Sequence, residues 1–304
     1  MINTLSAINS SLNKNPQEFI ELCEKTYNDQ IKKLAQTIVS DPKNRILMIA
    51  GPSGSGKTTT AHILKKELEK TGHKIQVVSL DNFYKSISDR EVLPNGEVDF
   101  ESVNALNINE ITRCFNELLT KGESLLPEFD FVTAKSIPNK LKINIGNDGL
   151  LVVEGIHGLN PEITRHLPEE NLFKIYVSVT VPIVDQDGKT VMTGRKIRLM
   201  RRVIRDSIFR GKSIRETLGL WTGVVEAENK ATRNFKKYAS FCVTTLHPYE
   251  PALYKKRFLE MMKEVTDDLP NSAYARQVAD GLEKFENLDE NLVPKTSLIR
   301  EFIG

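Results

Sequence analysis

The stretch from Arg45 to Thr60, RILMIAGPSGSGKTTT, decides the fold of this chain. It begins with a short, wholly apolar run, the pattern of a parallel strand that is buried on both faces. Its second half, Gly51 to Thr58, fits G-x-x-x-x-G-K-[ST], the phosphate-binding P-loop. The residues that follow carry Ala61, Leu64 and Leu68 on one face, which is helical spacing. A strand, a P-loop and a helix in this order predict a nucleotide site rather than a glycine-rich turn without a ligand.

Each residue type in the loop has a chemical reason. Glycine lets the backbone turn with positive φ and point successive N–H groups into one concavity, beside the positive end of the next helix. Lys57 supplies a mobile charge for the β- and γ-phosphates, and the Thr58 hydroxyl is a ligand for Mg²⁺. The expected cofactors are therefore ATP and Mg²⁺. The residues expected to bind ATP are Gly51, Ser53, Gly54, Ser55, Gly56, Lys57, Thr58 and Thr59.

Two further apolar segments end in a carboxylate. Residues 74–80 precede Asp81, and residues 150–153 precede Glu154. Open α/β sheets bind ligands at the carboxyl ends of their strands, where such an acid is delivered next to the metal. We therefore expect Asp81 and Glu154 to join Thr58 near Mg²⁺. The alternative for Asp81 is a structural role as a strand-end cap.

The composition is that of an ordinary globular protein. The chain has 304 residues, 39% of them hydrophobic and 27% charged, and a net charge of +2 that argues against general nucleic-acid binding. Its three cysteines are far apart and have no metal-ligand spacing, which is typical of free thiols in a reducing compartment. Neither a signal peptide nor an apolar run of membrane-spanning length is present. We expect a cytoplasmic protein with no membrane partner.

The pattern of segments predicts an α/β fold. Residues 1–43 are expected to form an N-terminal helical extension, with a loose lead-in up to Asn15 and helix from Pro16. Residues 44–304 alternate strands and helices, which predicts a P-loop NTPase fold with a parallel sheet flanked by helices. The tail of this domain, about 288–304, is too apolar to remain in water and is expected to dock on it.

A basic helix is predicted between Arg195 and Arg210, where seven cationic side chains accompany a single acid, Asp206. We expect a helical lid over about 195–212, open and mobile when no anion is near, because like charges repel. RNA binding is the other function of such a helix. Ordered arginines in a chain with a P-loop favour a phosphate clamp, so we expect no nucleic-acid partner.

Several motifs together resemble those of one enzyme family. They are, in chain order, residues 51–59, Ser79-Leu-Asp-Asn-Phe-Tyr84, Asp99-Phe-Glu-Ser102, Phe129-Asp-Phe131, Val153-Glu-Gly155, and Arg201-Arg-Val-Ile-Arg-Asp206 with Arg210-Gly211. This order resembles the uridine kinase and phosphoribulokinase family over roughly residues 20–304. The segments Glu154 to Asn160 and Thr296 to Gly304 are similar to its bacterial nucleoside kinase branch, many members of which begin with a TGS-type module and a synthetase-like module. The resemblance implies that the present sequence lacks both modules and starts at the helix that links them to the kinase.

The resemblance implies roles for matched positions. Asp81 resembles the catalytic base that accepts the proton of the acceptor hydroxyl, and Glu154 the acid near Mg²⁺. Arg205 and Arg210 are similar to arginines that face the phosphates, and with Lys57 and Asp81 they form the expected catalytic set. Glu101 matches an acid that binds ribose hydroxyls. The residues expected to contact the acceptor are Tyr84, Phe100, Glu101, Phe129, Phe131 and Arg202.

One departure concerns the base of the acceptor. Uridine–cytidine kinases have a tyrosine and a histidine where this chain has Phe129 and Ala134, which lack the polar groups that read a base edge. A site without those groups discriminates weakly, so the resemblance does not extend to pyrimidine specificity.

The sequence thus favours an ATP- and Mg²⁺-dependent kinase that phosphorylates a small-molecule hydroxyl, with the 5′-OH of a nucleoside as the leading acceptor. Another small polyol or a sugar phosphate is an alternative acceptor. A nucleotide-binding regulator without turnover is the alternative from a different class, disfavoured because Lys57, Thr58, Asp81 and Glu154 are all present. The sequence leaves open whether the chain forms a homo-oligomer.

Overall fold

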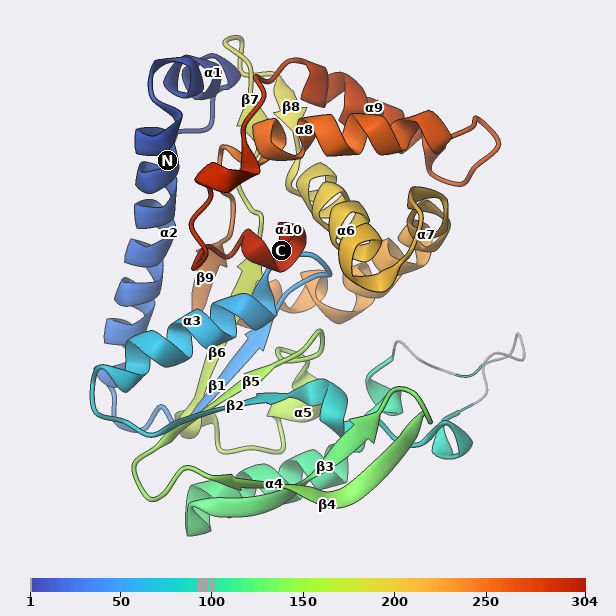
Figure 1. Cartoon of the computed structure of the whole chain (residues 1–304). Helices are drawn as coiled ribbons and strands as arrows, with labels where there is room; N and C mark the ends of the chain where they lie inside the picture. Colours follow the sequence, from blue (N-terminus) through green and yellow to red (C-terminus); the bar gives the residue numbers. More distant parts are fainter. Residues whose placement is uncertain (1, 92–97, 99–101) are drawn as a thin grey trace.

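The computed structural model describes residues 2–91, 98 and 102–304 (Figure 1). Its centre is a parallel sheet with the strand order β2-β5-β1-β6-β9. The strands are β1 (Ile46–Ala50), β2 (Ile75–Ser79), β5 (Leu150–Glu154), β6 (Leu172–Ser178) and β9 (Phe241–Thr244). Every residue of β1, β5 and β6 is buried, which explains why these segments are almost wholly apolar. The predicted P-loop α/β fold is confirmed.

The P-loop joins β1 to helix α3 (Lys57–Glu69). Gly54 and Gly56 have φ values of 69° and 80°, the left-handed region that glycine adopts without strain. Gly51 was expected to share this property, but its requirement is different: an added Cβ would lie 2.1 Å from the carbonyl oxygen of Val177 on β6. Glycine is therefore needed at position 51 for close packing of the loop on the sheet.

The N-terminal segment forms two helices, α1 (Leu5–Lys14) and α2 (Pro16–Val39). The prediction of a loose lead-in before Asn15 was wrong, because Ile8 and Leu12 on α1 are buried in the main core. Helix α2 begins at Pro16, where the Asn15 side chain accepts a hydrogen bond from the Glu18 N–H at 3.2 Å. Side chains of α2 then reach the rest of the chain, so the extension shares one core with the P-loop domain.

A group of helices gathers beside the N-terminal end of α3 (Figure 1). They are α6 (Gly194–Arg210), α7 (Ile214–Ala231), α8 (Glu250–Met261) and α9 (Ser272–Glu283), preceded by the short hairpin β7 (Ile183–Val184) and β8 (Thr190–Met192). The predicted basic helix is α6, and it buries Ile197, Met200 and Ile204 against its neighbours. It is part of the packed core.

The β2 edge of the molecule carries α4 (Ile108–Lys121), α5 (Pro161–Thr164) and an antiparallel pair, β3 (Glu123–Asp130) and β4 (Lys135–Asn144) (Figure 1). The extended piece expected at residues 126–133 overlaps β3. A turn over residues 131–134 joins the two strands, and the turn predicted at 147–149 leads from β4 into β5.

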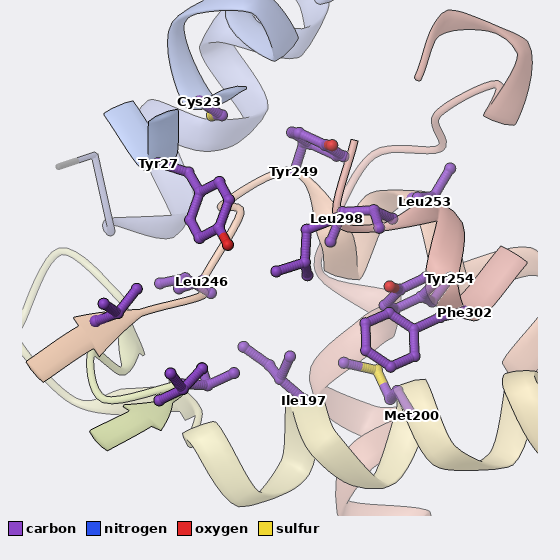
Figure 2. Close-up of a cluster of buried hydrophobic side chains, with 14 of the residues drawn as sticks. Cys23, Tyr27, Ile197, Met200, Leu246, Tyr249, Leu253, Tyr254, Leu298 and Phe302 are labelled. Atoms are coloured by element: carbon purple, nitrogen blue, oxygen red, sulfur yellow. The ribbon is translucent and has the colours of Figure 1, made fainter. Parts of the chain in front are cut away.

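The tail ends in the short helix α10 (Arg300–Ile303). Leu298, Ile299 and Phe302 are fully buried. Figure 2 shows Leu298 and Phe302 among Ile197 and Met200 of α6 and Leu246 and Tyr254 from the last strand-to-helix region. The C-terminus is thereby held next to the P-loop.

Cys23, Cys114 and Cys242 are all free thiols. Within residues 2–91, 98 and 102–304, no helix combines the length and apolar character needed to cross a bilayer.

Candidate active site

One cavity of about 390 Å³ brings the P-loop, the two strand-end acids and three arginines together. It is lined by Ser53, Gly54, Gly56, Lys57, Thr58, Thr59, Asp81, Glu154, Arg202, Arg205, Arg210 and Glu301. All of these except Glu301 were singled out from the sequence. Two expected residues of the loop, Gly51 and Ser55, are buried and do not line the cavity. The Ser55 carbonyl accepts a 2.7 Å hydrogen bond from the Thr245 hydroxyl.

The two acids reach the cavity because their strands are neighbours. Strands β2 and β5 pair in parallel with Ser79 opposite Glu154, and Asp81 follows β2 in a short 3₁₀ helix. Burial and the nearby charge of Glu154 raise the pKa of Asp81, while the charge of Lys57 opposes that rise. An acid with a raised pKa holds a proton more readily than a free aspartate does, which is the property expected of a base that accepts one.

Three arginines of α6 share one carboxylate. Asp206 is fully buried, and guanidinium nitrogens of Arg202, Arg205 and Arg210 lie 3.5, 2.7 and 3.3 Å from its oxygens. Arg202 also donates a 2.8 Å hydrogen bond to the Ser53 hydroxyl of the P-loop. Three positive groups face one negative group around Asp206, so this wall of the cavity carries excess positive charge and favours an anion.

The two other α6 arginines near the loop hold the P-loop itself. Arg198 pairs with Glu228 and donates to the Ser53 carbonyl at 3.0 Å. Arg201 forms a bidentate pair with Glu250, with N···O distances of 2.6 and 2.7 Å, and donates to the Gly54 carbonyl at 3.2 Å. Both pairs are buried.

These pairs correct the reasoning that predicted an open lid. Repulsion between the α6 cations was expected to hold the helix away from the site, but carboxylates of α7 and α8 and Asp206 neutralise much of that charge. The sequence showed only Asp206 as a partner for these arginines. Glu228 and Glu250 are distant in the chain, so no local pattern indicates that they pair with α6. Repulsion between cations therefore no longer supports the prediction that residues 195–212 move as a lid.

Replacing Arg201 with Ala is expected to lower the free energy of unfolding by about 3–5 kcal/mol, because it leaves Glu250 buried without a partner. Urea unfolding of the purified variant measures this loss. The matched control is Arg257→Ala, whose pair with Glu290 lies on the surface and should cost less than about 1 kcal/mol. Equal losses in the two variants would contradict the role assigned to the buried pair.

The aromatic residues expected at the acceptor form a separate cluster. The Phe129 ring centroid lies 5.7 Å from that of Tyr84 and 5.0 Å from that of Phe131. The Arg90 guanidinium stacks over Tyr84 and Phe129 at 4.8 and 5.1 Å. None of these residues lines the 390 Å³ cavity, although Tyr84 follows the 3₁₀ helix of Asp81 directly. Phe100 and Glu101 lie outside the described residues.

The sequence analysis missed two residues, one in the aromatic cluster and one in the P-loop cavity. Arg90 lies in a polar loop and belongs to no motif that indicates stacking on aromatic rings. Glu301 lies near the end of the chain, and its carboxylate accepts a hydrogen bond from the Thr59 hydroxyl. Two signals pointed to the tail, its apolar character and the resemblance of Thr296 to Gly304 to a kinase branch, but neither indicated a role for Glu301.

The fold and the site define a protein of the P-loop NTPase class. The Phosphoribulokinase / Uridine kinase family matches residues 46–247, and the chain belongs to this family. The match begins at β1 and ends just after β9, so it includes the P-loop, both acids and α6 but leaves out the tail with Glu301.

Relatives are similar to this chain at modest identity. The uridine kinase of Lactobacillus johnsonii is 27% identical over 199 residues, which are 65% of this chain and 85% of the relative. The uridine kinase of Saccharomyces cerevisiae is 29% identical over 183 residues, 60% of this chain. Uridine kinase-like protein 5 of Arabidopsis thaliana is 27% identical over 181 residues, again 60% of this chain. The matches span only 32% of the yeast protein and 34% of the plant protein.

A solved structure also shares the fold. It comes from Silicibacter sp. and is provisionally assigned as a fructose transport system kinase. Its TM-score is 0.51 at 17% identity, with 70% of this chain and 98% of that chain covered.

Proposed function

We propose that this protein is an ATP- and Mg²⁺-dependent kinase that phosphorylates a hydroxyl of a small molecule, with the 5′-OH of a nucleoside as the leading acceptor. The observation that carries the proposal is the common cavity of Lys57, Asp81 and three arginines. Such a cavity provides charge stabilisation and a proton acceptor together, which are the two contributions that phosphoryl transfer needs from a protein.

The residues divide the work as follows. The P-loop amides and Lys57 hold the triphosphate. As the acceptor oxygen bonds to the γ-phosphorus, its proton passes to the Asp81 carboxylate, and the bond from that phosphorus to the β–γ bridging oxygen breaks to release ADP. Arg202, Arg205 and Arg210 stabilise the charge that spreads over the transferred group and the leaving oxygen.

The donor atoms present fit Mg²⁺. This ion prefers oxygen ligands and is usually held by one or two carboxylates together with substrate phosphates. The cavity offers the Thr58 hydroxyl and the carboxylates of Glu154 and Asp81. No group of three or more His, Cys, Asp or Glu side chains that could hold a metal ion occurs in the described part of the chain. When bound, Mg²⁺ would neutralise phosphate charge.

A coupled ADP-release screen over nucleosides, sugars, polyols and sugar phosphates tests the proposal. Turnover with a nucleoside supports the leading acceptor. Turnover with a polyol or a sugar phosphate, and with no nucleoside, would show that the acceptor belongs to the second class. ATP binding without turnover on any acceptor would favour the nucleotide-binding regulator.

The pH dependence of turnover should show the raised pKa of Asp81. The carboxylate must be unprotonated to accept a proton, so kcat is expected to fall as the pH falls through its pKa. Because burial and Glu154 raise that pKa, the decline should begin at a higher pH than the ordinary value of about 3.9 predicts. A kcat–pH profile in a pH range where circular dichroism shows intact fold measures this. A flat acidic limb down to about pH 4 would contradict the assignment.

A further inference from the structure

The C-terminal helix contributes a carboxylate to the cavity that the proposed kinase reaction does not use. Glu301 on α10 lines the same space as Lys57 and Thr58, and it accepts a hydrogen bond from the Thr59 hydroxyl. Thr59 is in the first turn of α3, whose positive end also favours a negative group. The residue lies beyond the segment that matches the family.

The tail holds Glu301 in a defined position. Leu298 packs so closely on the P-loop that a Cβ added to Gly56 would lie 2.9 Å from its Cδ1. The buried Phe302 ring lies 4.9 Å from the guanidinium of Arg201, the side chain that donates to the Gly54 carbonyl. Arg300 donates to the carbonyls of Glu290 and Gly304 at 3.1 and 2.9 Å. Glu301 is thus part of the wall of the site.

The charge of Glu301 is unsuited to a phosphate neighbour. Among the residues that the structure describes, no cationic side chain lies within 4.0 Å of its carboxylate, and its hydrogen-bond partner is a neutral hydroxyl. A carboxylate without a direct ion-pair partner repels a neighbouring phosphate but accepts hydrogen bonds from neutral O–H groups. A sugar with adjacent hydroxyls is therefore a better neighbour for it than any phosphate of the donor.

The arrangement of the helices and strands indicates which part of the donor nucleotide lies next to Glu301. Lys57 and Thr58 serve the β- and γ-phosphates, and the acids that follow β2 and β5 lie on the side of the transferred phosphate. Helix α10 packs against α6, near the N-terminal end of the P-loop helix α3 (Figure 1). Because the two acids lie on the side of the transferred phosphate, we place the nucleoside half of the donor on the side of Thr59 and α10.

We propose that Glu301 accepts hydrogen bonds from the ribose hydroxyls of the donor nucleotide and so selects ribonucleotides over deoxyribonucleotides. This inference rests on the proposed function, because it assumes that the P-loop binds a nucleoside triphosphate. It makes Glu301 a specificity-determining residue of the donor site.

Calorimetric binding of ATP, 2′-deoxyATP and 3′-deoxyATP to the full chain, with Mg²⁺ present, tests the proposal. The unmodified protein is expected to bind ATP about 10- to 100-fold more tightly than the weaker of the two deoxy forms, the range for hydrogen bonds to a charged group. Glu301→Ala should reduce this preference to less than about threefold by weakening ATP while leaving that deoxy form nearly unchanged. Glu301→Gln retains one carbonyl acceptor and should give an intermediate preference.

The control is Glu290→Ala, which removes a surface carboxylate from the same tail and should keep the full preference. Equal binding of all three nucleotides to the unmodified protein would overturn the ribose contact while leaving the kinase proposal intact. A Glu301→Ala variant that binds all three more tightly by one common factor would also overturn it, because the carboxylate would then act by repelling the triphosphate. Absence of ATP binding to the unmodified protein would overturn both proposals.

Discussion

Replacing Lys57 with Ala is expected to lower turnover by at least about 10³-fold while the protein remains folded. The lysine supplies the positive charge at the β- and γ-phosphates, where negative charge is redistributed during transfer. A second effect adds to the first: the charge of Lys57 lowers the pKa of Asp81, so its loss should leave more of that base protonated. Steady-state kinetics with the acceptor identified by the ADP-release screen measures the change.

The matched control is Lys65→Ala on the same helix, a lysine that pairs with Glu69 at the surface. It should change neither kcat nor stability by a large factor, because surface pairs contribute little. Lys57→Arg keeps the charge but changes its shape and reach, so it should recover only part of the rate. If Lys57→Ala retained the normal rate, the kinase proposal would fail.

The fold could be predicted because its signals are local. Three signals lie within a few residues of one another in the sequence: the apolar strand β1, the glycine pattern after it and the helical spacing of α3. The two acids could be found for the same reason, since each directly follows an apolar strand. Their meeting in one cavity followed from the rule that parallel strands bring their carboxyl ends to one edge.

The features that escaped prediction depend on distant partners. Arg198 and Arg201 looked like free cations of a basic helix, but Glu228 and Glu250 come from α7 and α8. Helix α1 escaped because two buried residues, Ile8 and Leu12, are a weak periodic signal in a polar segment. Glu301 escaped because the resemblance of Thr296 to Gly304 carries no position in space, and the place of the carboxylate depends on how the whole tail packs.

Replacing Asp81 with Asn should lower kcat roughly 10²–10⁴-fold, because the amide keeps the size of the side chain but cannot accept the proton. ATP affinity should stay the same or rise slightly, since the variant removes a negative charge beside Glu154 in a site that receives a triphosphate. The acidic limb of the kcat–pH profile should also disappear, because the group that titrates there is gone. Asp89→Asn, an exposed aspartate later in the same loop, is the control and should behave like the unmodified protein. A loss of ATP affinity as large as the loss of kcat would instead assign Asp81 chiefly to Mg²⁺, and the proton would then need another acceptor.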